Sequence, residues 1–354
     1  MVRSTEGAPG AAFGQQYCRM QYTTLGQTDV RVSRVCLGTA FRSARDEATH
    51  IAAIHAAIDM GCNYLDTANV YQDGQSERIV GKAVKGRRDK LVIETKVGSP
   101  MTGDQTVADL SRGAIMQSVD DSLARLDLEF IDSLICHFPD EVVPHVETFG
   151  ALDELVKAGK VRTVGVSRWE SWRLAQVLGA CEQGGFARPV SNQCAYSLLD
   201  RRLENEVLPY CGRVGVSVTA FATTLIGLLT GRYRFGEPPP PGTSWHRGPY
   251  NFRHAMRPTT GQVIDSLVRV ADEAGHTPTQ VAIAWCLHHG VTSVIIGADT
   301  VEQVHENFVA GDITLSDGHV AQLDDASDGM CLSVRKGCPG GWVDDDDDAS
   351  AGMK

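Results

Sequence analysis

Several features that would place this chain in a specialised class of protein are missing from it. No apolar run approaches the roughly 18 residues that a membrane-spanning helix needs. Residues 1–16 lack the apolar core of a secretory signal. The 10 cysteines form no Cys-x-x-Cys pair, and no Cys/His spacing matches a zinc site. We therefore expect no metal, no membrane partner and a reduced, cytoplasmic location.

Basic residues are in the minority, with 33 Lys and Arg against 44 Asp and Glu. The resulting net charge of −11 argues against a general nucleic-acid surface. Apolar residues make up 42% of the 354 residues and charged residues 22%, a balance typical of a globular protein with a large core.

The two ends of the chain differ in composition from its middle. Residues 1–19 are rich in Gly, Ala and Gln, and we expect a flexible N-terminal segment. Residues 331–354 include five consecutive Asp at 344–348 and are expected to form an acidic, disordered tail. An acidic tail can be a docking site, although a solvated tail is the simpler interpretation. Residues 20–330 remain as one folded domain.

Within that domain, short β-branched runs alternate with longer segments of helical periodicity. The expected strands are 35–38, 63–66, 91–96, 130–137, 161–167, 190–193, 216–221 and 293–297. The expected helices are 48–60, 76–84, 107–126, 146–158, 171–181, 203–212, 262–274, 278–288 and 301–310. Such alternation predicts an α/β fold of parallel βαβ units.

The near-constant spacing of these units favours a (β/α)₈ TIM barrel over an open sheet. A Rossmann domain lacks its fingerprint here, because no Gly-x-Gly-x-x-Gly follows the first strand. Residues 20–25 and 30–32 flank a turn and predict an N-terminal β-hairpin that closes the bottom of the barrel. The interval after strand 7 is the longest and holds four prolines at 238–241, so it predicts a long loop.

Polar residues stand at the carboxyl ends of three adjacent predicted strands, where barrel enzymes build their active sites. They are Asp66, Lys96 and His137, and Tyr71 follows on the loop after Asp66. Alone, each could be a cap, a surface charge or a packing residue. Together they can make a proton donor and an oxyanion site, because a nearby lysine favours tyrosinate and a neutral histidine can orient a carbonyl oxygen. No side chain supplies a hydride, so a nicotinamide is implied.

The same residues carry a resemblance to a known family. Residues 64–71 resemble the Asp-Thr-Ala-x-x-Tyr motif of the aldo-keto reductases, residues 94–96 resemble that family's lysine strand, and residues 131–137 its histidine strand. Further similarity lies at 74–83, 159–167, 191–193, 204–209, 227–231 and 303–307, so that it covers about residues 20–325.

The resemblance implies an enzyme that binds NADP(H) or NAD(H) and reduces a small-molecule aldehyde or ketone. Tyr71 would be the general acid, tuned by Lys96 and Asp66, and His137 would orient the carbonyl. The implied cofactor contacts are Ser167 and Gln193 for the carboxamide, Phe221 for the nicotinamide face, Glu306 and Asn307 for the adenine, and Thr39, Arg168, Ala222, Thr223, Leu225, Gly227, Gly297, Asp299 and Gln303. Candidates for the substrate wall are Phe41, Phe138 and Trp169.

Four positions depart from the family's pattern. Arg168 replaces the usual Asn, Phe221 replaces the commoner Tyr, and residues 222–224 replace the usual Ser-Pro-Leu. Asp299 stands where many NADPH-preferring relatives place Lys or Arg. Because a carboxylate repels a 2′-phosphate and accepts from a free ribose hydroxyl, we expect a weaker NADP preference. The alternative is that Asp299 faces solvent and a loop arginine contacts the phosphate.

The loop 231–258 carries five arginines against one glutamate. Such a loop could bind the cofactor's phosphates or an anionic substrate such as a phosphorylated or nucleotide-linked sugar, or it could be solvated or contact a second copy in a homo-oligomer. Its aromatic residues could line a pocket or anchor the loop; they are Trp245, Tyr250 and Phe252.

Three functions are compatible with the sequence. The first is a carbonyl reductase or alcohol dehydrogenase. The second is a nucleotide-binding regulatory subunit similar to the channel β-subunits of this superfamily. The third is a keto-sugar or enoyl reductase of secondary metabolism, which the arginine-rich loop would favour. The complete set of four candidate catalytic residues favours an enzyme over a regulatory subunit.

Overall fold

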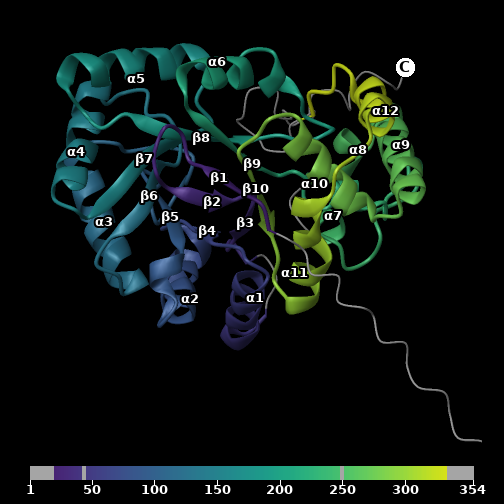
Figure 1. The fold of residues 1–354 in the computed structure, drawn as a ribbon, viewed down its shortest axis with the longest axis horizontal. Coiled ribbons are helices and arrows are strands. Elements are labelled where there is room, and N and C mark those ends of the chain that lie inside the picture. The colour runs from purple at the N-terminus through teal and green to yellow at the C-terminus, as the bar shows by residue number, and fades with distance from the viewer. Residues whose placement is uncertain (1–19, 42–44, 248–250, 333–354) are drawn as a thin grey trace, which may run out of the picture.

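The computed structural model describes residues 20–41, 45–247 and 251–332, in which eight parallel strands close into a barrel. Neighbouring strands follow chain order from β3 to β9, and β10 pairs with both β9 and β3. Helices surround the strands (Figure 1). The predicted (β/α)₈ barrel is thereby confirmed. The predicted flexible segment 1–19 and all but two residues of the predicted acidic tail lie outside the described residues.

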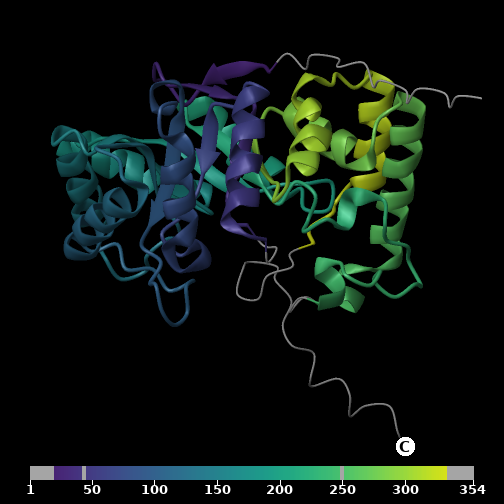
Figure 2. The same ribbon diagram turned by 90° about the horizontal axis from the view of Figure 1, so that it is seen from below.

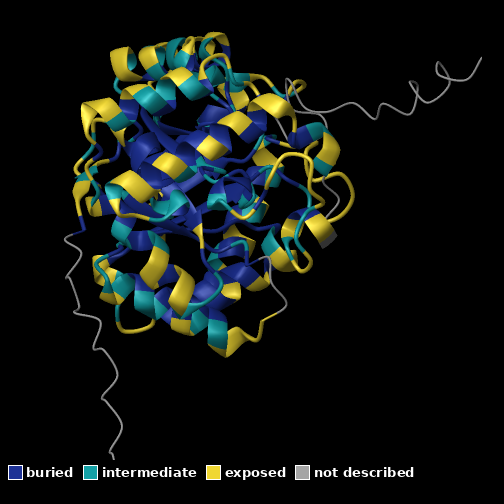
Figure 3. Cartoon of the chain, turned by 90° about the vertical axis from the view of Figure 1, so that its right-hand side faces the viewer, coloured by how far each residue is buried: buried dark blue, intermediate teal, exposed yellow. Residues whose placement is uncertain are grey.

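The barrel strands lie close to their predicted positions, because strands buried on both faces in a parallel sheet form continuous apolar, β-branched runs. They are β3 (Val35–Gly38), β4 (Tyr64–Asp66), β5 (Val92–Val97), β6 (Ile131–Cys136), β7 (Val161–Ser167), β8 (Pro189–Ala195), β9 (Ser217–Phe221) and β10 (Ser293–Gly297). Figure 3 shows these strands buried in the interior and the exposed residues on the outer faces of the helices.

A β-hairpin covers the amino-terminal end of the barrel, as predicted. Its strands, β1 (Tyr22–Thr24) and β2 (Arg31–Ser33), pair antiparallel. The hairpin's apolar side chains Leu25, Val30 and Val32 enter one cluster with residues of the barrel interior, namely Cys36, Tyr64, Val92 and Ile295. In Figure 2 the purple hairpin lies at one end of the barrel, and part of the green loop that follows β9 lies at the opposite end. The hairpin therefore closes the amino-terminal end of the barrel.

The outer helices include α1 (Glu47–Asp59), α2 (Gln75–Val84), α3 (Arg112–Leu126), α4 (His145–Lys157), α5 (Ser171–Gly184), α6 (Val207–Val214), α9 (Pro258–Ala274), α10 (Pro278–His288), α11 (Val301–Phe308) and α12 (Asp317–Ser327). Within the described ranges, none of the helices is long and apolar enough to cross a bilayer.

Several helices differ from the sequence-based expectation; α9, for example, begins at Pro258 and not at residue 262. The helix expected over 107–126 begins only at Arg112, because the Ser111 hydroxyl caps it by accepting from the Ala114 N–H. The helix expected over 203–212 begins at Val207, after a separate 3₁₀ turn. Helix α12 was not predicted; it packs against α9 through buried residues that include Val320 and Leu323.

The long loop after the seventh barrel strand, β9, is anchored by its aromatic residues. Its short helices are α7 (Ser244–Arg247) and α8 (Phe252–Ala255). Tyr233 and Trp245 are buried, and their rings lie 5.9 and 6.0 Å from that of Phe252. Arg234 donates to the Gly231 carbonyl, and Arg257 donates to the His254 carbonyl, so two of the loop's arginines brace its own backbone. Tyr250 lies outside the described residues.

Candidate active site

Three polar strand ends meet at the carboxyl-terminal rim because β4, β5 and β6 are adjacent parallel strands. Asp66 is the last residue of β4, Lys96 lies near the end of β5, and His137 directly follows β6. Tyr71 begins a 3₁₀ turn just after β4, at residues Tyr71–Gly74. The fold thus brings together all four residues that the sequence analysis proposed as catalytic.

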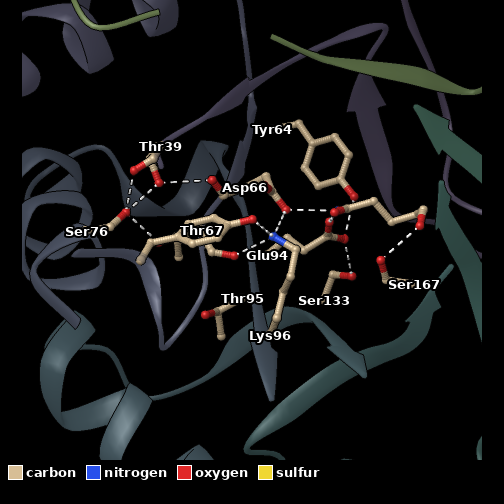
Figure 4. Close-up of polar contacts among 12 residues, drawn as sticks. Thr39, Tyr64, Asp66, Thr67, Ser76, Glu94, Thr95, Lys96, Ser133 and Ser167 are labelled. Carbon is tan, nitrogen blue, oxygen red and sulfur yellow. Dashed lines mark hydrogen bonds and ion pairs between the residues drawn. The ribbon is translucent and has the colours of Figure 1, made fainter. Parts of the chain in front are cut away.

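Lys96 is the centre of this group. Its side chain is fully buried, and its Nζ donates to Asp66 Oδ1 at 2.5 Å, to the Thr67 carbonyl at 2.8 Å and to Tyr71 Oη at 3.2 Å (Figure 4). Burial by itself lowers the pKa of Lys96, but the charges of Asp66, Tyr71 and Glu94 outweigh it and raise the pKa above its ordinary value. Lys96 is therefore a cation held against a tyrosine hydroxyl.

The fourth residue, His137, is buried beside the tyrosine. Its ring meets the Tyr71 ring edge-on at 6.0 Å between centroids and stacks on Phe138 at 4.9 Å. The His137 backbone N–H donates to the Val97 carbonyl, which ties the end of β6 to β5. A tyrosine hydroxyl and an imidazole at one rim can both contact the oxygen of a bound carbonyl group.

Glu94 also belongs to the group, although the sequence analysis gave it no role. It pairs in register with Asp66, is fully buried and accepts hydrogen bonds from Tyr64, Ser133 and Gln193. Burial, followed by the charge of Asp66, raises the pKa of Glu94 to about 7. The sequence contained one signal for Glu94. It is an acidic residue in a strand that is otherwise suited to burial, two positions before Lys96.

Ser167 and Gln193 lie side by side at the ends of β7 and β8, where the carboxamide contact was proposed. Both are buried, and Ser167 Oγ donates to the Gln193 carbonyl at 2.9 Å. Gln193 Nε2 donates to Asp66 Oδ1 at 2.9 Å and to Glu94 Oε1 at 2.8 Å. The amide of Gln193 is therefore bonded directly to the acidic residues of the site.

Arg168 lies between two aromatic rings at the same rim. Its guanidinium carbon is 4.7 Å from the Phe138 ring centroid and 4.4 Å from that of Phe221. Such contacts hold a planar cation by cation–π attraction. Arg168, which replaces the family's usual Asn, thus places a cation on the Phe221 ring. The resemblance implies that this same ring stacks on the nicotinamide.

Strained backbone is concentrated in the loops of this rim. Eight non-glycine residues of the described chain have a positive φ, and all but Asp127 follow a barrel strand; the seven are Phe41, Gln72, Asp73, Arg168, Ala222, Leu225 and Ile226. Left-handed backbone costs energy for such residues and is typical of functional sites. After β9, the Leu225 N–H donates to the Ala222 carbonyl, Thr223 is buried and Gly227 has a φ of 82°.

The proposed cofactor contacts of this region run from the end of β10 to the last turn of α11. Gly297, the last residue of β10, is exposed, and the Asp299 N–H donates to Gln303 Oε1 at 2.7 Å. Glu306 is exposed and Asn307 half-buried on the same helix. These five residues thus lie together on one segment at the mouth of the barrel.

The remaining candidates are engaged inside the protein. Thr39 Oγ1 is buried and donates to the Asp66 carbonyl at 2.9 Å. Phe41 is buried and stacks on His50, with ring centroids 4.1 Å apart. Trp169 is 1% exposed and packs edge-on against Phe149. Of the three proposed substrate-wall residues, Phe138 is the one that is half-exposed.

Comparison with known proteins identifies relatives over most of the chain. A sequence model described as "Aldo/keto reductase family" matches residues 34–328, which include all eight barrel strands. The chain is 33% identical to a "Probable voltage-gated potassium channel subunit beta" of Arabidopsis thaliana, over 83% of this chain and 92% of that protein. It is 34% identical to "Uncharacterized oxidoreductase YrpG" of Bacillus subtilis, over 86% and 95%. It is 32% identical to "Aldo-keto reductase dtxS3" of Metarhizium robertsii, over 82% and 87%.

Proposed function

This chain belongs to the aldo/keto reductase family, and from that premise we propose that it reduces an aldehyde or ketone to an alcohol with NAD(P)H. The observation that carries the proposal is the buried array of Asp66, Lys96 and Tyr71 beside His137. When bound, the nicotinamide supplies the hydride that the carbonyl carbon accepts.

Residues of the chain supply the proton that the carbonyl oxygen takes up during the reduction. As hydride arrives at the carbonyl carbon, the carbonyl oxygen becomes negative and takes the proton from Tyr71 Oη. The tyrosinate left behind is stabilised by Lys96 Nζ, which lies 3.2 Å from that oxygen and is itself paired with Asp66. His137 orients the carbonyl oxygen before the transfer. Tyr71 then regains a proton from solvent.

The rim offers groups that fit a dinucleotide. Gln193 presents an amide carbonyl and Ser167 a hydroxyl for the carboxamide, and Phe221 a ring for stacking. Ala222, Leu225, Ile226 and Gly227 have left-handed backbone, a conformation that occurs in the nests of N–H groups that bind a pyrophosphate. Gly297 leaves room for close approach at the adenosine end, where a side chain would otherwise project.

We further propose that NADH is used at least as well as NADPH. Asp299 stands at the start of α11, and Glu302 adds a second carboxylate in the first turn of that helix. Two carboxylates disfavour a 2′-phosphate, whereas a free ribose 2′-hydroxyl can donate to one.

The substrate that we propose is a small carbonyl compound. Phe138 supplies an apolar wall beside His137, and Arg168 supplies a cation at the same mouth, so an aldehyde or ketone that carries an anionic group suits the site. A phosphorylated or nucleotide-linked keto-sugar is the class that we propose to test first.

The test is a titration of the purified protein with NADH and NADPH, followed by nucleotide fluorescence. Aldehydes, ketones and keto-sugars are then added to the same sample. Tight binding with oxidation of the nucleotide supports the reductase, and absence of binding to either nucleotide contradicts it.

The likeness to the plant protein named as a channel β-subunit favours a second candidate, a nucleotide-binding regulatory subunit. The same titration separates the two. Tight nucleotide binding with negligible oxidation by every acceptor would favour the regulatory subunit.

A further inference from the structure

Glu94 is fully buried in the barrel interior beside Asp66 and Lys96 (Figure 4). It is two residues before Lys96 on β5, so both side chains point to the same, inner side of the strand. Its Oε2 accepts from Tyr64 Oη at 2.5 Å and from Ser133 Oγ at 2.7 Å. Its Oε1 accepts from Gln193 Nε2 at 2.8 Å. A fully buried carboxylate is expensive, so this set of partners calls for an explanation.

The Gln193 contact determines how that amide is turned. Gln193 Nε2 lies 2.9 Å from Asp66 Oδ1 and 2.8 Å from Glu94 Oε1. Asp66 is a carboxylate paired with Lys96 and can only accept hydrogen bonds, so the –NH₂ end of the amide faces Asp66 and, from there, Glu94 Oε1. The opposite orientation would set the amide oxygen against two carboxylates. Both N–H groups are thereby used, and Oε1 is the atom of the amide that remains to accept from a ligand.

From this arrangement we infer that Glu94 is a positioning residue for the nicotinamide end of the dinucleotide. By accepting the second N–H of Gln193, it keeps Gln193 Oε1 turned toward the –NH₂ group of a bound carboxamide. The inference rests on the proposed function, because it requires that a nicotinamide binds at this rim.

Asp66 alone is a weaker anchor for the amide. Its Oδ1 already accepts from Lys96 Nζ at 2.5 Å, so it shares one oxygen between two donors. Without Glu94, one of the two carboxylates that forbid the flipped amide is gone. The Gln193 amide would then sample both orientations, and only one of them presents an acceptor to the carboxamide.

The test compares two ligands that differ only in the nicotinamide: NADH, and ADP-ribose, which lacks it. Glu94→Leu fills much of the same volume without an acceptor, and Glu94→Ala is a second variant of the same kind. Either is expected to raise the Kd for NADH about three- to tenfold and to leave the Kd for ADP-ribose unchanged. If the wild type prefers NADPH, the pair is NADPH and 2′-phospho-ADP-ribose.

Three further variants separate positioning from packing. Glu94→Gln keeps an oxygen for Gln193, and its –NH₂ group can donate to the hydroxyl oxygens of Tyr64 and Ser133 once their O–H bonds turn away, so it is expected to bind NADH like the wild type. Ser133→Ala removes a donor to Glu94 Oε2 and is likewise expected to leave the Kd unchanged. In the background of Gln193→Ala, loss of Glu94 is expected to add nothing further.

An equal loss of affinity for NADH and ADP-ribose would show a general structural role and overturn the inference. So would wild-type affinity in Glu94→Leu, or additive losses in the Gln193→Ala background. If the wild-type protein bound neither dinucleotide, the proposed function itself would fall, an outcome that the wild-type titration reveals before any variant is made.

Discussion

The buried carboxyl of Glu94 gives the stability of this protein a pH dependence that one substitution should remove. Burial and the neighbouring Asp66 charge raise the pKa of Glu94 from 4.5 to about 7. The folded protein therefore holds a proton between these values that the unfolded chain releases. A carboxyl whose pKa is raised on folding favours the folded state at low pH, and this contribution is lost as pH rises through about 7.

The size of the effect follows from the shift. A difference of about 2.5 pKa units corresponds to about 3 kcal/mol of unfolding free energy between pH 4.5 and pH 8. Glu94→Gln has no proton to lose, so its unfolding free energy should lack this decline. Relative to the wild type, the variant should gain about 2 to 3 kcal/mol between pH 5 and pH 8.

The assay is urea unfolding of both proteins at half-unit steps from pH 5 to pH 8, followed by tryptophan fluorescence. Other groups with raised pKa values, such as Asp132, titrate in both proteins and cancel in the difference. Ser133→Ala retains the carboxyl but loses a hydrogen bond that lowers its pKa, so this control should keep the decline and extend it to higher pH. Parallel curves for Glu94→Gln and the wild type would refute the reasoning, because they would show that Glu94 does not titrate on folding in this range.

Three further predictions concern catalysis, cofactor choice and packing. Tyr71→Phe should lower kcat by about 10²- to 10⁴-fold and leave the nucleotide Kd nearly unchanged, and loss of nucleotide binding instead would remove Tyr71 from the proton-donor role. Asp299→Ser should raise the affinity for NADPH relative to NADH about three- to tenfold, measured by parallel fluorescence titrations, and an unchanged ratio would show that Asp299 does not face the ribose. Gly81→Ala should destabilise the fold by about 3 kcal/mol or more, because its new methyl would lie 2.1 Å from the Leu126 carbonyl oxygen where α2 meets α3. A melting temperature equal to that of the wild type would contradict this interpretation of the helix contact, and Gly179→Ala, at an open position within helix α5, is the matched control.

The sequence alone predicted the strands well, because a strand buried on both faces is visible as a local run of apolar, β-branched residues. β3, β7 and β10 have the predicted bounds. Parallel strands of a barrel end at one rim, and this rule was sufficient to predict that Asp66, Lys96 and His137 lie close together. Helix beginnings were less predictable, since the start of α3 depends on a single cap at Ser111 and not on apolar periodicity.

The contacts between the site residues, in contrast, depend on the closure of the barrel. Gln193 and Glu94 are 99 positions apart in sequence, and they meet because β5 and β8 face each other across the barrel interior. Arg168 reaches the Phe221 ring in the same way, from the end of β7 to the end of β9. Local periodicity shows that a residue faces inward, but its partner is determined by strand order, register and closure, which are properties of the whole fold.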